Sequence, residues 1–130
     1  MEYNGCSPAA AQRRILAQQG LTEEALWEKF NHAAREEVRL AVALEGFAHS
    51  ARNEAYRAYL SRRLRPAVQA LLEENQVAEL AALEQVVGFT REQVDDFLAQ
   101  AIQLGRAEAI AWLLGRKTEE YGFRDRDFSL

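Results

Sequence analysis

The chain has 130 residues and a formal net charge of −4, a length that fits a single domain. Its 48% hydrophobic content and only two prolines favour a folded helical chain over disorder. The negative charge disfavours non-specific binding to nucleic acid or anionic membranes. No apolar run reaches the ~20 residues of a membrane span, and the first residues lack a signal peptide's basic and apolar regions. We therefore expect a cytoplasmic protein that does not enter the membrane.

The N-terminal part of the chain predicts a short first helix. We expect residues 1–6 to be flexible. Ser7 is a good N-cap and Pro8 suits the first helical position. Gly20 ends the helix, because glycine readily takes the left-handed conformation found after a helix.

A long amphipathic stretch follows in residues 22–49. Thr22 is its predicted N-cap. Apolar residues recur at helical spacing to the end of this stretch, and the pattern leaves open whether it is one helix or two. Gly46 lies inside the pattern, where it costs about 1 kcal/mol against alanine, so we expect it to permit a close packing contact.

Residues 50–88 form the next predicted unit. Ser50 is the expected N-cap of a helix that extends to Leu64. Pro66 disfavours helical geometry at the preceding residue, so a new helix is expected to start there. Gly88 closes the unit.

Residues 89–121 contain the clearest pattern, a helix, a glycine turn and a second helix. Thr90 and Gln93 have the spacing of a capping box, and Gly105 marks the turn. Both helices have an apolar stripe that should face a shared core. The stripes are Val94, Phe97, Leu98, Ala101 and Ile102 on the first helix, and Ile110, Leu113 and Leu114 on the second.

This helix pair resembles the helical part of an ankyrin repeat. The matching residues are Ala101, Gly105, Glu108, Ala109, Ile110, Leu113 and Leu114. The family's Thr-Pro-Leu-His start is absent, since Asp96-Phe97-Leu98-Ala99 stands in its place. The pair is also similar to the end of uncharacterised bacterial helical proteins with a Leu-Leu, charged, aromatic-Gly-Phe tail.

The resemblance implies an all-α fold of stacked antiparallel helix pairs, an ankyrin-like α-solenoid. Counting the predicted segments gives about seven or eight helices and no sheet. The candidate units are 22–49, 50–88 and 89–121 within a single domain 1–130. Residues 122–130 are expected to cap the last pair, or alternatively to form a short linear motif. A compact bundle without repeats is the alternative fold.

The sequence shows no pattern typical of catalysis or cofactor binding. His32 and His49 have no neighbouring ligand at metal-binding spacing, and the single cysteine, Cys6, lies near the chain end without a partner base. Phosphate-binding and nucleophile-elbow motifs are absent. We expect neither enzymatic activity, nor a metal, nor a cofactor.

Arginines gather between residues 52 and 65, with two tyrosines among them. This combination is typical of nucleic-acid binding. At about 100° per residue, however, the arginines spread around a helix, which favours ion pairs with neighbouring helices. The cluster is Arg52, Arg57, Arg62, Arg63 and Arg65, with Tyr56 and Tyr59. Residues 94–114 also fit a helix-turn-helix, although the second helix offers few base-reading donors beyond Arg106.

We predict a non-catalytic protein–protein interaction module with an unidentified protein partner. Nucleic-acid binding through the arginine cluster is the alternative. Aromatic residues and arginine are enriched at binding hot spots, which selects the candidate contact residues. They are Trp112, Tyr56, Tyr59, Arg57, Arg62 and Arg63. The sequence does not define the oligomeric state.

Overall fold

The computed structural model describes residues 7–49 and 53–118, and within them it contains eight α-helices and no β-strand. The prediction of an all-α chain is confirmed. The predictions for residues 1–6, Cys6, Arg52 and the tail 122–130 lie outside the described residues. The helices are α1 (Pro8–Gln19), α2 (Glu23–His32), α3 (Glu36–His49), α4 (Glu54–Arg62), α5 (Leu64–Glu73), α6 (Val77–Val87), α7 (Arg91–Leu104) and α8 (Ala107–Lys117).

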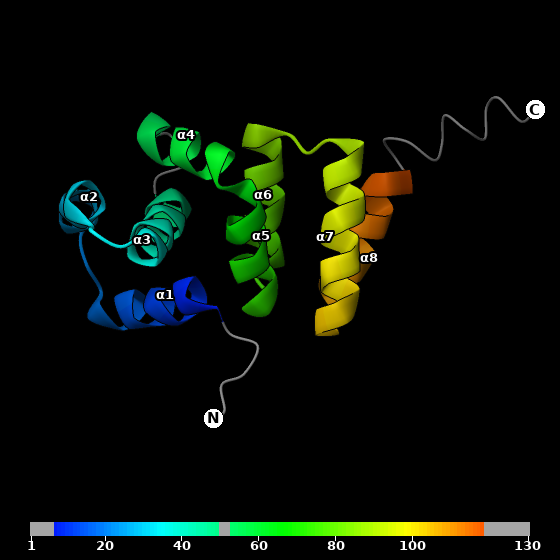
Figure 1. Ribbon diagram of the computed structural model, residues 1–130, viewed down its shortest axis with the longest axis horizontal. Coiled ribbons are helices and arrows are strands. Elements are labelled where there is room, and N and C mark those ends of the chain that lie inside the picture. Colours follow the sequence, from blue (N-terminus) through cyan, green and yellow to red (C-terminus); the bar gives the residue numbers. More distant parts are fainter. Residues whose placement is uncertain (1–6, 50–52, 119–130) are drawn as a thin grey trace, which may run out of the picture.

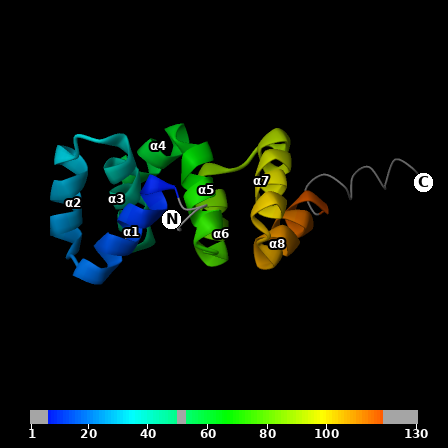
Figure 2. The same cartoon turned by 60° about the horizontal axis from the view of Figure 1, so that its bottom comes forward.

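The helices are spread along the long axis of the molecule, with the N-terminal ones towards one end and the C-terminal ones towards the other (Figures 1 and 2). The α2 helix lies at one end, the α7–α8 pair at the other, and α5 and α6 between them. In the N-terminal half, α3 packs against α1, α2 and α4. In the C-terminal half, α5 contacts α6 and α7, while α8 contacts α7 and α6.

Several helix ends are confirmed as the sequence predicts them. The Ser7 side chain accepts from the Ala10 N–H, and Thr22 caps α2 in the same way. Both hydrogen bonds of the capping box between Thr90 and Gln93 are present at the start of α7. Gly105 has φ 70° and ψ 34° after α7, in the left-handed region that favours glycine. Local side-chain chemistry therefore determines these boundaries.

The stretch 22–49 consists of two helices. The first ends at His32, where Ala33 takes an extended conformation with φ −67° and ψ 126°. The second begins at Glu36, and Arg39 on it donates to the Ala33 carbonyl at 2.8 Å. Because the chain turns here, α2 can fold back onto α3 and bury Phe30.

The described part of the stretch 50–88 contains three helices. Asn53 is the N-cap of α4, because its Oδ1 accepts from the Ala55 and Tyr56 N–H groups at 2.9 and 3.3 Å. This corrects the expectation that Ser50 starts that helix. The second correction concerns the break before α5, which falls at Arg63 with φ −116° and ψ 39°. Pro66 is the third residue of α5, where a missing N–H costs no helical hydrogen bond.

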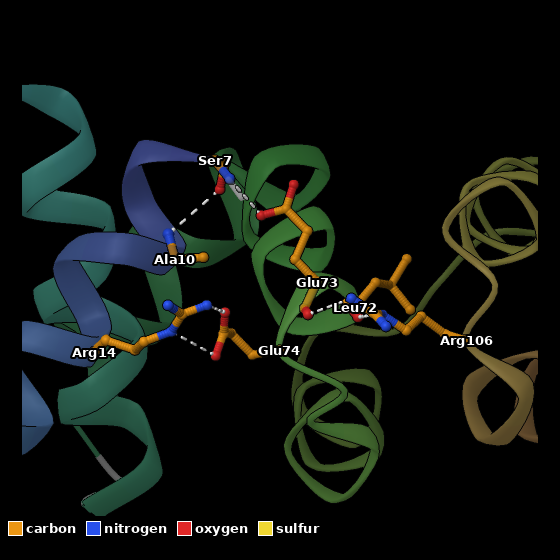
Figure 3. Close-up of polar contacts among 7 residues, drawn as sticks. All are labelled: Ser7, Ala10, Arg14, Leu72, Glu73, Glu74 and Arg106. Carbon is orange, nitrogen blue, oxygen red and sulfur yellow. Dashed lines mark hydrogen bonds and ion pairs between the residues drawn. The ribbon is translucent and has the colours of Figure 1, made fainter. Parts of the chain in front are cut away.

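The C-terminal end of α5 connects the two halves of the molecule (Figure 3). On one side, Glu73 accepts from the Ser7 backbone N–H at 2.7 Å, and Glu74 pairs with Arg14 at 2.8 Å. On the other side, Arg106 donates to the carbonyls of Leu72 and Glu73 at 3.0 and 2.9 Å. These carbonyls lie in the last turn of α5, where that of Leu72 also accepts from the Asn75 N–H at 3.1 Å. Arg106 adds a donor to each carbonyl and holds the α7–α8 turn in place.

A buried ion-pair network joins α1, α3 and α6. Arg13 is buried, and its guanidinium pairs with Glu45 at 2.9 Å and Glu79 at 2.5 Å. Burial lowers the pKa of Arg13, but the hydrogen bonds and charges of Glu79 and Glu45 outweigh this effect, so the net pKa is raised. The network therefore keeps a buried charge fully compensated.

None of the described helices combines the length and the low polarity that crossing a lipid bilayer requires.

Candidate functional site

Large apolar side chains are exposed on the outer side of the α7–α8 pair. Ile102 on α7 is 60% exposed and Leu114 on α8 is 48% exposed. Leu98 and Ile110 are half-buried beside them and pack against the core. We call these four residues the outward strip: Leu98, Ile102, Ile110 and Leu114.

The helical period and one ion pair place the strip residues next to one another. Ile102 lies seven positions, two helical turns, after Asp95 and therefore on the same side of α7. Leu114 lies three positions before Lys117, again on one side of α8. The Lys117 ammonium pairs with the Asp95 carboxylate at 3.0 Å, so these two sides adjoin. The strip therefore runs along the line where α7 and α8 meet.

The strip lies to one side of the surface through which the pair packs against the rest of the molecule. The buried side of α7 consists of Val94, Phe97 and Ala101, and α5 packs against α7. Ile102 lies roughly 100° around the helix from the centre of that side. On α8 the buried residues are Ala109 and Leu113. No described helix covers the strip, because α5 and α6 occupy only one side of the pair.

This arrangement corrects the predicted core of the helix pair. Ile102 and Leu114 were expected in the shared core, but both are exposed. Leu113 is fully buried as expected, and Ala109 takes the second buried place on α8. An amphipathic stripe becomes buried only where a neighbouring helix covers its full width, and this pair has neighbours on one side.

The candidate aromatic contact residues are mostly inside the fold. Tyr56 and Tyr59 are 3% and 6% exposed, and their rings pack edge-on against Phe30 at 5.0 and 5.5 Å. Tyr59 also donates its hydroxyl to the Glu36 carboxylate. Both rings are therefore largely buried, and their role as partner contacts stays a prediction. Trp112 is half-buried against the core, on the side of α8 away from the outward strip.

Burial and charge act together on the two tyrosines. Burial raises the pKa of Tyr59, and the hydrogen bond and charge of Glu36 raise it further. Burial also raises the pKa of Tyr56, and the Glu23 carboxylate adds to this effect. Both hydroxyls therefore stay protonated at neutral pH.

The arginines near α4 do not form one basic surface. Arg63 pairs with Glu36 at 2.9 Å, and Arg65 pairs with Asp96. Arg57 is half-buried and Arg62 is exposed, and neither has an ion pair with another described residue. Two of the four described arginines are thus neutralised by acidic residues of other helices.

The helix-turn-helix interpretation also loses its main donor. Arg106 lies just before α8, and its guanidinium donates to the α5 carbonyls described above. A side chain that satisfies buried carbonyls of the fold is not available to read bases.

The two histidines lie at helix surfaces. His32 and His49 each make a 2.9 Å hydrogen bond through Nδ1 with the carbonyl four residues earlier, that of Glu28 and of Glu45. Across residues 7–49 and 53–118, no three His, Cys, Asp or Glu side chains come together in a way that could hold a metal ion.

Comparison of the chain with protein-family models, with curated proteins and with solved structures finds no match.

Proposed function

We propose that this chain is a non-catalytic protein-interaction module, and that its partner docks an amphipathic helix on the outward strip. The observation that carries this proposal is the exposure of Ile102 and Leu114 on adjoining sides of two antiparallel helices. Between two adjoining helices runs a groove into which the side chains of a third helix can pack. Full burial of a leucine or isoleucine contributes about 1.5–3 kcal/mol, so covering these half-exposed residues contributes roughly half of that for each.

The proposal includes an ankyrin-like solenoid arrangement for the C-terminal half. The pairs α5–α6 and α7–α8 follow each other in the chain. They contact each other first helix to first helix and second to second, through α5–α7 and α6–α8. Consecutive units of an α-solenoid pack in this way. Such stacks present extended surfaces that usually bind proteins.

Nucleic-acid binding through the arginine cluster has less support. Arg63 and Arg65 form ion pairs with Glu36 and Asp96, which reduces the positive charge available to phosphates. The net charge of the chain is also negative. Phosphate binding relies on releasing counterions through several free basic side chains.

The test compares three forms of the full chain as bait in nuclease-treated extract of the native host. They are the wild type, the double variant Ile102→Glu/Leu114→Glu, and the control Ile15→Glu. Ile15 is 48% exposed, like Leu114, but lies on α1. We expect a protein that the wild type and the control retain and the double variant loses, and whose docking segment, made as a peptide, binds the purified chain.

Two results would overturn the proposal. One is a retained protein that the double variant binds as well as the wild type does. The other is the absence of any retained protein that distinguishes the variants, with circular dichroism showing that all three forms are folded.

A further inference from the structure

A second surface feature lies at the opposite end of the molecule, where α2 meets α3 and α4. It is a pocket of about 320 Å³, which we call the aromatic pocket. Its wall is formed chiefly by Glu23, Glu24 and Trp27 of α2, Gly46 of α3 and Tyr56 of α4. The pocket therefore combines carboxylates with two aromatic rings.

The aromatic side of the pocket is held by ring packing. Trp27 and Tyr56 meet edge to face, with centroids 5.7 Å apart and planes at 76°. Phe30 supports both rings from the core, at 5.8 Å from Trp27 and 5.0 Å from Tyr56. Trp27 nevertheless keeps 38% of its surface exposed. Its π system is thus fixed in place and accessible.

The Tyr56 hydroxyl is available to a ligand at the pocket wall. The residue is 3% exposed, and none of the described residues makes a hydrogen bond with its hydroxyl. A Cβ on Gly46 would overlap the Cε2, Cζ and Oη atoms of this ring. Since both residues line the pocket, the hydroxyl end of the ring lies at the pocket wall. The hydroxyl oxygen is not fully buried, so it can accept a hydrogen bond from a ligand in the pocket.

The acidic side of the pocket consists of two carboxylates that no described basic residue neutralises. Glu23 and Glu24 are exposed in the first turn of α2, and neither forms an ion pair with a described basic residue. Glu23 is close enough to Tyr56 to raise its pKa. Two carboxylates, a hydroxyl and an aromatic face therefore line the same pocket.

We propose that the aromatic pocket binds the guanidinium group of an arginine side chain carried by a polypeptide partner. A guanidinium is planar, stacks on aromatic faces and donates two parallel hydrogen bonds to a carboxylate. Trp27 supplies the face, Glu23 and Glu24 supply the acceptors, and the Tyr56 oxygen accepts one further N–H. The inference rests on the proposed function only in assigning the arginine to a partner protein.

The experiment uses the full chain with Trp112→Phe, which leaves Trp27 as the only tryptophan. N-acetyl-arginine amide is titrated while the fluorescence and the indole N–H resonance of Trp27 are followed. N-acetyl-citrulline amide is the matched neutral probe, because it keeps the shape and loses the charge. We expect saturable binding of the arginine probe with a dissociation constant on the order of 1 mM, and at least tenfold weaker binding of the citrulline probe.

Variants locate the site. We expect the double variant Glu23→Gln/Glu24→Gln to bind the arginine probe at least tenfold more weakly. The control is Glu28→Gln, because Glu28 is an exposed carboxylate of the same helix outside the pocket, and this variant should bind the probe as the parent does. Equal binding of both probes, no saturable change, or an unaffected double variant would overturn the proposal. Free L-arginine that binds tenfold more tightly than the capped probe would also overturn it, since the ligand would then be a small molecule.

The result of the arginine titration does not depend on the result of the bait experiment. Ile102→Glu/Leu114→Glu changes the outward strip, at the other end of the molecule, and should leave the arginine titration unchanged (Figure 1). A failed titration likewise leaves the bait experiment on the strip unaffected.

Discussion

The helices α3 and α7 have the same length and share one spacing of apolar residues, but they differ in how much they bury. Each has 14 residues, yet α3 buries seven of them and α7 buries three. Residues 40–44 of α3 are all apolar, whereas polar residues separate the members of the α7 stripe. The neighbours differ too, because α3 packs against α1, α2 and α4, whereas α7 packs mainly against α5 and α8. An amphipathic pattern thus states which side of a helix can be buried, and the neighbours determine how much of it is.

The largest expected difference between the two regions concerns their ion pairs. Arg13→Met removes the buried cation between Glu45 and Glu79, which leaves two carboxylates without their partner. We expect a loss of about 3–5 kcal/mol in the free energy of unfolding. Lys117→Met removes the exposed pair with Asp95 and should cost at most about 1 kcal/mol. Urea denaturation measures both, and similar losses in the two variants would contradict the comparison.

The second comparison replaces one leucine by alanine in α3 and one leucine by alanine in α8. Leu44→Ala deletes a buried side chain of α3, and we expect a loss of about 2–5 kcal/mol. Leu114→Ala acts on a half-exposed residue of the outward strip and should cost less than about 1 kcal/mol. Thermal and urea unfolding of the two variants provide the measurement. A Leu114 effect as large as that of Leu44 would show that the strip is covered in solution.

Local signals in the sequence predicted much of the fold. Ser7, Thr22, Thr90 and Gly105 set helix ends through hydrogen bonds and backbone geometry that involve only near neighbours. The N-cap Asn53 follows the same rules, because asparagine is a preferred N-cap residue and stands three positions before Tyr56, so the sequence contained this signal.

The candidate site was less predictable, because burial depends on contacts between distant parts of the chain. Tyr56 is inside because Phe30 and Gly46 accommodate its ring. Arg106 is used by the fold because the end of α5 lies beside it, 33 positions away in the sequence for Glu73. No periodicity in the sequence indicates such pairs.

Replacing a glycine by alanine should have opposite effects on the stability of the two regions. In Gly46→Ala the new methyl group would overlap the Tyr56 ring, so we expect a loss of about 1–3 kcal/mol from overpacking. In Gly115→Ala the new methyl group on α8 meets no atom within 4 Å, so its higher helix propensity should stabilise the protein by up to about 1 kcal/mol. Calorimetric melting of both variants tests this, and a stabilised Gly46→Ala would contradict the packing.

The smallest effect is a pH dependence confined to the N-terminal region. The folded state raises the pKa of Tyr59 above its ordinary value of 10.0. Its contribution is complete below about pH 10 and is lost as the pH rises further, because the unfolded chain then releases a proton that the folded chain retains. Tyr59→Phe should cost about 0.5–1.5 kcal/mol at neutral pH, and the difference from wild type should shrink above pH 10. Denaturation at pH 8 and pH 11 measures it, and a constant difference would contradict it.

The most direct test of the outward strip is site-specific photo-crosslinking in living cells of the native host. A benzophenone amino acid replaces Ile102 in one form of the chain and Ile15 in a second, matched form. We predict a discrete cross-link from position 102 to another polypeptide, at an amphipathic helical segment, and no such product from position 15. Cross-links from 102 only to a second copy of this chain, or equal products from both positions, would contradict the assignment of the strip as a partner-binding surface.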